Sequence, residues 1–192
     1  HFEGDYTNVT EDRVVTLYYV DAIKDNVTFN NGLHGKLNST ESNVTFSVFV
    51  DNTFEEGGVV APAVTADEGY SFTGWDAEFN KDTVVTGDLS YTAEYKINSY
   101  NLTIHYKYTD GSEAASDYTT TLDYNSNYLV NSPKITGYTA NRFVVFGKMG
   151  AEDKEITVYY NINYYLLTVN YLHTNGFPIA FSKIFIVKYN EN

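Results

Sequence analysis

Residues 92–111 read TAEYKINSYNLTIHYKYTDG, and residues 157–176 follow the same pattern without a gap, as TVYYNINYYLLTVNYLHTNG. The offset between the two copies, from residue 92 to residue 157, is 65 residues. Self-similarity at a fixed period is typical of arrays of small supersecondary units rather than of one large domain. We therefore predict that the chain is a tandem array of small modules.

The repeat also indicates where the modules begin and end. At the same offset Tyr124-Asn125 falls on Tyr189-Asn190, so the protein is expected to continue past Asn192. Residues 11–19 (EDRVVTLYY) match residues 152–160 (EDKEITVYY), which close the repeat. The predicted segments are the last strand of a preceding repeat at 1–22, a related module at 23–97, the repeat itself at 98–163 and an incomplete second copy at 164–192.

Alternating apolar and polar residues predict β-strands in every module. The alternating apolar positions are Val44, Phe46, Val48 and Val50, then Tyr91, Ala93, Tyr95 and Ile97, then Leu102, Ile104, Tyr106 and Tyr108. A composition of 19 Tyr and 12 Phe against 3 Pro and 1 Met favours strands further. We expect a mostly β chain, α+β at most, whose one plausible helical turn lies at residues 52–57.

Turn and linker residues predict how the strands are connected. The pairs Asp110-Gly111, Asn175-Gly176 and Asn31-Gly32 suit tight hairpin turns, because their residues tolerate positive φ. No linker rich in Pro, Gly or Ser separates the modules, so residues 97–99 and 162–164 must join one module to the next almost directly. The sequence therefore predicts a fairly stiff, elongated rod.

Composition argues against several classes of function. The chain carries 25 acidic and 12 basic residues, for a net charge of -13. Because nucleic acids and anionic membranes are bound mainly through Lys and Arg, we expect neither as a partner. There is no Cys for disulfides or thiolate metal sites. The longest apolar stretches, such as residues 164–169, fall short of the roughly 18 apolar residues of a membrane span, so we expect no membrane insertion within this fragment.

Two groups of motifs resemble known families. Asp110-Gly111, the run PKITGY at residues 133–138 and the closing ITVYY at residues 156–160 resemble the MucBP (mucin-binding protein) repeat of Gram-positive surface proteins. The run GYSFTGW at residues 69–75 resembles the internalin B-repeat and Listeria-Bacteroides repeat group. The first resemblance departs from the usual pattern at residues 143–147 (FVVFG), which are more apolar.

These resemblances imply β-grasp-like (ubiquitin-like) modules in a wall-anchored or exported array. They also imply either adhesion to host glycoproteins or a role in extending other domains from the cell. Neither family is enzymatic. We accordingly expect an extracellular, non-catalytic adhesin fragment of the cell wall or cell surface, with a mucin-type host glycoprotein or glycan as its partner.

Four aromatic residues are the candidate ligand-binding residues: Trp75, Tyr108, Tyr159 and Tyr164. Trp and Tyr can stack on sugar faces, but packing in the core is the stronger interpretation of Trp75. In the adjacent tyrosines at 18–19, 159–160 and 164–165, one ring of each pair is expected to be buried and the other exposed. Exposed rings could bind a ligand or seal the contact between neighbouring modules, and both interpretations stay open.

Other chemistry has little support in the sequence. Four histidines without any Cys predict no catalytic residues, no metal site and no cofactor, and His105 is expected to face solvent without a partner. The alternative to ligand binding is a passive stalk that projects another domain from the cell wall. We expect a monomer, in which the unpaired edges of the truncated C-terminal hairpin can pair with another chain.

Overall fold

The computed structural model describes residues 11–12 and 22–190, and these residues form strands and no helix. The prediction of a mostly β chain is confirmed. No helix of the described residues is long and apolar enough to cross a membrane. Tyr18 and Tyr19, and with them the predicted strand before residue 22, lie outside the described residues.

The strands fall into three groups along the chain. Module A, as we call the first group, consists of β1 (Lys24–Asn30), β2 (Gly35–Leu37), β3 (Asn43–Phe49), β4 (Val64–Ala66), β5 (Tyr70–Trp75) and β6 (Leu89–Ile97). Module B consists of β7 (Ser99–Tyr108), β8 (Glu113–Asp123), β9 (Asn127–Asn131), β10 (Tyr138–Ala140), β11 (Val144–Lys148) and β12 (Lys154–Ile162). The C-terminal hairpin consists of β13 (Tyr164–Leu172) and β14 (Pro178–Lys188).

Both modules place their first and last strands side by side in the middle of a four-stranded sheet. The strand order is β3-β1-β6-β5 in module A and β8-β7-β12-β10 in module B. The central pairs, β1 with β6 and β7 with β12, are parallel, and the outer strands are antiparallel to them. A separate two-stranded ribbon completes each module, β2-β4 in A and β9-β11 in B. This arrangement is compatible with the predicted β-grasp-like type.

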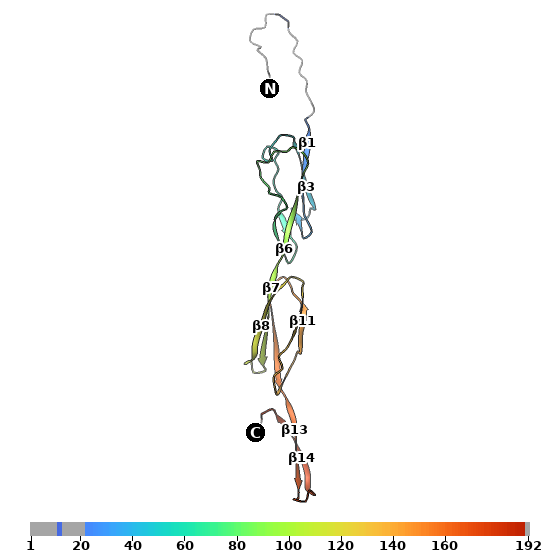
Figure 1. Ribbon diagram of the computed structural model, residues 1–192, viewed down its shortest axis with the longest axis vertical. Coiled ribbons are helices and arrows are strands. Elements are labelled where there is room, and N and C mark those ends of the chain that lie inside the picture. The colour runs from blue at the N-terminus through green and yellow to red at the C-terminus, as the bar shows by residue number, and fades with distance from the viewer. Residues whose placement is uncertain (1–10, 13–21, 191–192) are drawn as a thin grey trace.

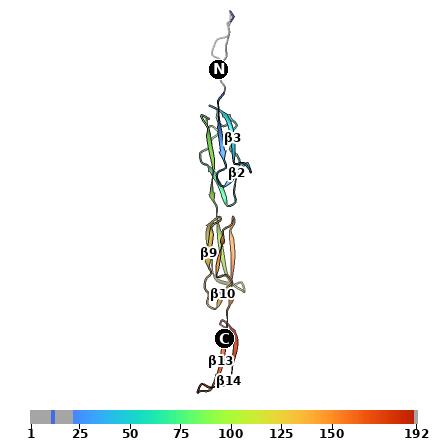
Figure 2. The same cartoon turned by 90° about the vertical axis from the view of Figure 1, so that its right-hand side faces the viewer.

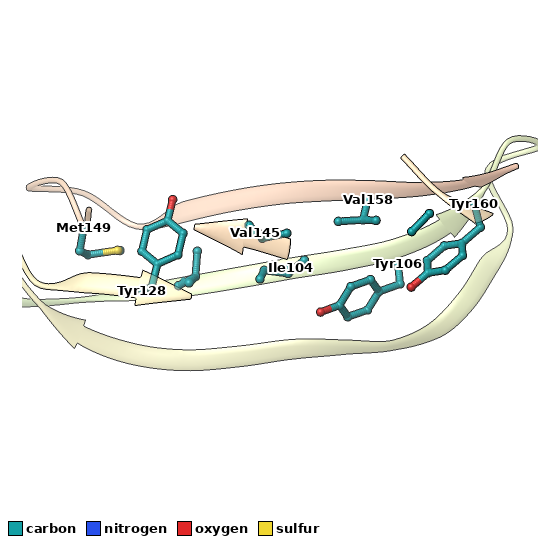
Figure 3. Packing of buried hydrophobic residues seen from close by; sticks show 9 residues of the cluster. Ile104, Tyr106, Tyr128, Val145, Met149, Val158 and Tyr160 are labelled. Atoms are coloured by element: carbon teal, nitrogen blue, oxygen red, sulfur yellow. The ribbon is translucent and has the colours of Figure 1, made fainter. Parts of the chain in front are cut away.

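Each module has an apolar core of its own. In module A the core gathers around Phe29 of β1, whose ring lies 4.9 Å from that of Trp75 and 5.2 Å from that of Tyr91. In module B the alternating positions Leu102, Ile104 and Tyr106 are buried, as predicted. Figure 3 shows the labelled members of the second core: Met149, Tyr128, Val145, Ile104, Val158, Tyr106 and Tyr160.

Two of the three predicted hairpin turns form. Gly111 has a φ of 88°, and the N–H of Tyr108 donates to the carbonyl of Ser112 at 2.8 Å, which closes the β7-β8 hairpin. Gly176 has the same φ of 88° in the β13-β14 hairpin. The third prediction is wrong. Gly32 has a positive φ of 67°, but it lies against the carbonyl of Ala93, and β1 pairs with β3 instead of β2.

The predicted helical turn forms as one capped turn and stops there. The N–H of Thr53 donates to the Glu56 carboxylate at 2.9 Å, and the N–H of Glu56 donates to Oγ1 of Thr53 at 3.2 Å, which is a capping box. Gly57 donates to the carbonyl of Thr53 at 2.9 Å, and Gly58 then takes a φ of 67°. Because a residue in the left-handed backbone conformation ends a helix, the turn does not continue as a helix.

The modules follow each other along one axis (Figure 1), and the view turned by 90° shows the same slender shape (Figure 2). β6 passes into β7 through the single residue Asn98, and β12 passes into β13 through Asn163. The predicted direct joins and elongated rod are therefore confirmed. The C-terminal hairpin is a two-stranded ribbon, so Tyr164 and Tyr165 are both exposed, and the prediction of one buried ring in this pair is wrong.

Candidate binding site

A hollow of about 600 Å³ opens on module B beside the edge strand β10. Its lining comes from the end of β9, the loop before β10, β10 itself, the start of β11 and one residue of β12. The lining residues are Asn131, Ser132, Pro133, Lys134, Ile135, Tyr138, Thr139, Ala140, Phe143, Val144 and Tyr160. A single chain segment, residues 131–144, thus supplies all of the wall except Tyr160.

Tyr160 connects this hollow to the core of module B. Strand alternation turns its ring inward, where it is 1% exposed, while the neighbouring Tyr159 is 43% exposed. The Tyr160 hydroxyl donates to the carbonyl of Pro133 at 2.6 Å and so holds the loop before β10 against β12. Burial, followed by the nearby Tyr106, raises the pKa of Tyr160, so the phenol keeps the proton that it donates.

Two hydrogen bonds of Ser132 hold another part of the wall of the hollow. Its hydroxyl donates to the carbonyl of Arg142 at 2.6 Å, and its N–H donates to the carbonyl of Phe143 at 2.9 Å. These bonds close the ribbon just where β9 ends and β11 begins. Phe143 is consequently fixed at the rim of the hollow with its ring 71% exposed.

The lining combines an apolar wall with a few polar groups. Ile135, Ala140 and Phe143 form the apolar part, and Asn131 and Lys134 add exposed polar side chains. Concave, largely apolar walls with a few polar groups are typical of preformed small-molecule sites. No histidine or carboxylate is among the described lining residues, and the titratable side chains of the lining are Lys134, Tyr138 and Tyr160.

The structure does not gather the four predicted aromatic residues into one site. Tyr108 lies beside the hollow, because its ring is 4.6 Å from that of Tyr138 in the lining. Tyr159 points to the opposite side of β12 from Tyr160, and Tyr164 lies beyond the module on β13 with an exposure of 61%. Trp75 lies in module A, half-buried and packed edge-on against Phe29 and Phe72.

Sequence reasoning missed most of the lining. Asn131 and Ser132 belong to no motif and no regular alternation, so no local signal distinguishes them from ordinary loop residues. Lys134 lies in the run PKITGY, which indicated a family resemblance but no binding role. Phe143 and Val144 did have a signal, because they begin the run FVVFG that departs from the repeat pattern. Exposed apolar side chains at a fixed loop are a stronger indication of binding than exposed apolar residues scattered singly.

On the solvent face of the module B sheet, the expectation that His105 has no partner is wrong. His105 has a partner, because its Nδ1 lies 2.8 Å from the carboxylate of Asp117 on β8, and its Nε2 lies 3.8 Å from Glu155 on β12. The pairing arises because adjacent strands bring side chains of one face together. Within the part of the chain that the structure describes, no group of three or more His, Cys, Asp or Glu residues could hold a metal ion.

Comparison with known families gives one match, which lies within module B. Residues 101–161 match the MucBP domain, which confirms the resemblance found in the sequence. Among solved structures, the chain is similar to the type 2 repeat of the mucus binding protein MUB from Lactobacillus reuteri, with 16% identity over 72% of this chain and 100% of that one and a TM-score of 0.32. It is also similar to Mub-RV, with 16% identity over 73% of this chain and 98% of that one and a TM-score of 0.29.

Among curated proteins, no sequence matches this chain. The resemblance of residues 23–97 to the internalin B-repeat group stays a prediction.

Proposed function

We propose, from the match of residues 101–161 to the MucBP domain, that this chain is part of an extracellular, non-catalytic adhesin. Its ligand is a saccharide of a mucin-type glycoprotein, and its binding site is the hollow of module B. The domain match supports the adhesin-type role. The position of the exposed Phe143 ring beside polar side chains supports the choice of this site.

The hollow suits a sugar ring on chemical grounds. A pyranose has a flat face of C–H groups that packs on an aromatic ring, and Phe143 offers such a ring at the rim. Its hydroxyls need hydrogen-bonding groups around that face, and Asn131 and Lys134 offer an amide and an ammonium group. Tyr160 and Ser132 hold the walls in place before a ligand arrives, which reduces the entropy lost on binding.

Further contacts and the setting of the protein complete the proposed function. Tyr108, Tyr159, Tyr164 and Trp75 are proposed further contacts, with Tyr108 nearest to the hollow through Tyr138. The proposed domains are residues 1–22, 23–97, 98–163 and 164–192. We place the protein at the cell wall or cell surface as a monomer, with a glycoprotein partner and no nucleic acid, in keeping with the net charge of -13.

Two phenylalanines of the same ribbon provide a matched test. Phe143→Ala removes the ring at the rim of the hollow and should weaken saturable binding to immobilised mucin about tenfold or more, as truncation of an aromatic anchor does. Phe146→Ala is the control, because Phe146 is equally exposed at 74% but does not line the hollow. Equal binding by both variants would refute the site.

The alternative function is a passive stalk. The single-residue joins at Asn98 and Asn163 favour it, because they produce the slender rod that a spacer requires (Figure 1). A chain that binds neither mucin nor any member of a glycan panel at physiological salt would support the stalk in place of the adhesin.

A further inference from the structure

Asn98 is bonded to both modules that it joins. Its N–H donates to the carbonyl of Gly69 at 2.8 Å, and its side-chain Oδ1 accepts the hydroxyl of Ser71 at 2.7 Å, both in module A. Its own carbonyl accepts the N–H of Tyr124, in module B, at 2.8 Å. The two backbone groups and the side-chain oxygen of the joining residue are therefore all engaged.

Asn163 repeats this pattern 65 residues later, between module B and the C-terminal hairpin. Its N–H donates to the carbonyl of Gly137 at 2.8 Å, and its Oδ1 accepts the hydroxyl of Thr139 at 2.6 Å. Its carbonyl accepts the N–H of Tyr189 at 2.9 Å. Each bond of the first joint thus has a counterpart in the second.

A tyrosine ring of the following unit covers a glycine at each joint. Gly69 and Gly137 have φ values of 78° and 80°, and a Cβ added to Gly69 or Gly137 would clash with the ring of Tyr124 or Tyr189, respectively. The same rings meet a second tyrosine edge-on. Tyr124 lies 6.2 Å from Tyr70 at 73°, and Tyr189 lies 6.2 Å from Tyr138 at 71°.

The units that precede the two joints differ, which makes the coincidence informative. The ribbon strands come at different points of the chain. In module A, β2 and β4 precede and follow β3 in the sequence, whereas in module B, β9 and β11 precede and follow β10. Their common feature is a Gly-Tyr-Ser/Thr run at an edge strand that pairs with the last strand, at residues 69–71 and 137–139. In both following units the tyrosine precedes an Asn of positive φ, 61° for Asn125 and 58° for Asn190.

We propose that the Gly-Tyr-Ser/Thr edge and the joining Asn form a docking surface whose partner is the Tyr-Asn turn of a following MucBP-type unit. The contact fixes the orientation of that unit, so the rod is stiff because each joint is filled. Both types of preceding module carry this surface, and on both it accepts the same turn of the unit that follows. The inference concerns module orientation and is independent of whether the hollow binds a ligand.

Spin-label distance measurements test the first joint in the whole chain. Because the sequence contains no Cys, Ser42→Cys in module A and Thr119→Cys in module B, both at exposed positions, place one label on each module. We expect a narrow distance distribution in this parent and at least a doubling of its width in Tyr124→Ala. Tyr124→Phe keeps the ring and should stay narrow.

Substitution of the glycine separates steric fit from backbone strain. Gly69→Ala should broaden the distribution because the new Cβ displaces the Tyr124 ring. Gly58→Ala is the control, since Gly58 also has a positive φ, of 67°, but has no atom within 4 Å of an added Cβ. It should leave the distribution as narrow as in the parent.

A broad distribution in the parent, or an unchanged width in both Tyr124→Ala and Gly69→Ala, would overturn the proposal. Circular dichroism verifies that each variant is folded. Should either variant fail to fold, Ser71→Ala removes the side-chain bond to Asn98 and gives the same test, with a broader distribution expected.

Discussion

Tyr160 shows how much a single side chain decides in this molecule. Its ring is part of the module B core, its hydroxyl fixes the loop at Pro133, and the same ring lines the hollow. Tyr159 has the same chemistry but lies on the other side of the strand. The role of each tyrosine is therefore set by the face of the strand on which it lies, more than by the type of its side chain.

Removal of one hydroxyl tests this role. Tyr160→Phe should lower the free energy of unfolding of module B by about 1 kcal/mol, because the bond to the Pro133 carbonyl is lost while the ring remains. Tyr159→Phe, at an exposed ring, should change it by less than about 0.5 kcal/mol. Urea unfolding followed through NMR signals of module B measures both values, and equal losses in the two variants would contradict the assignment.

Buried tyrosines also predict the pH dependence of stability. Burial raises the pKa of Tyr91, Tyr106 and Tyr160 above the ordinary value of 10.0, with smaller contributions from neighbouring ionisable groups. Because their folded-state pKa lies above the unfolded one, their stabilisation is fully present below pH 10.0 and is lost as the pH rises through the raised value. Urea midpoints should fall above pH 10.0, and constant midpoints through that range would contradict the prediction.

At the scale of elements, the sequence predicted the strands well and their pairing poorly. Alternation identified β3, β6 and β7, and the Asp110-Gly111 turn identified the β7-β8 hairpin. The parallel pairing of β7 with β12 sets Leu102 opposite Lys154, and no local pattern encodes a contact between residues so far apart in the sequence. The hollow was missed for the same reason, because residues 131–144 become a wall only when Tyr160 holds their loop.

The central strand β1 provides a test of separate cores. Phe29→Ala removes a ring that contacts Phe46, Trp75, Phe79 and Tyr91, so it should destabilise module A by about 3–5 kcal/mol. Module B has its own core and should stay folded. In a heteronuclear NMR spectrum, loss of the module A signals alone is expected, whereas simultaneous loss of the module B signals would show that the two cores are one cooperative unit.

At the scale of the whole molecule, two similar joints turn separate sheets into one rod (Figure 1). Repeat arrays gain reach in this way, because each unit contacts only its neighbours. In the proposed adhesin, the rod carries the hollow of module B away from the cell. Tyr138 belongs both to the wall of this hollow and to the second joint, where Tyr189 packs on it.

Titration of the isotope-labelled chain with mucin-derived oligosaccharides, followed by NMR, tests the proposed function most directly. The account predicts saturable shifts of the amide signals of residues 131–144, with the signals of the β2-β4 ribbon in module A unchanged. Shifts confined to other parts of the chain, or no shifts at saturating oligosaccharide, would contradict it.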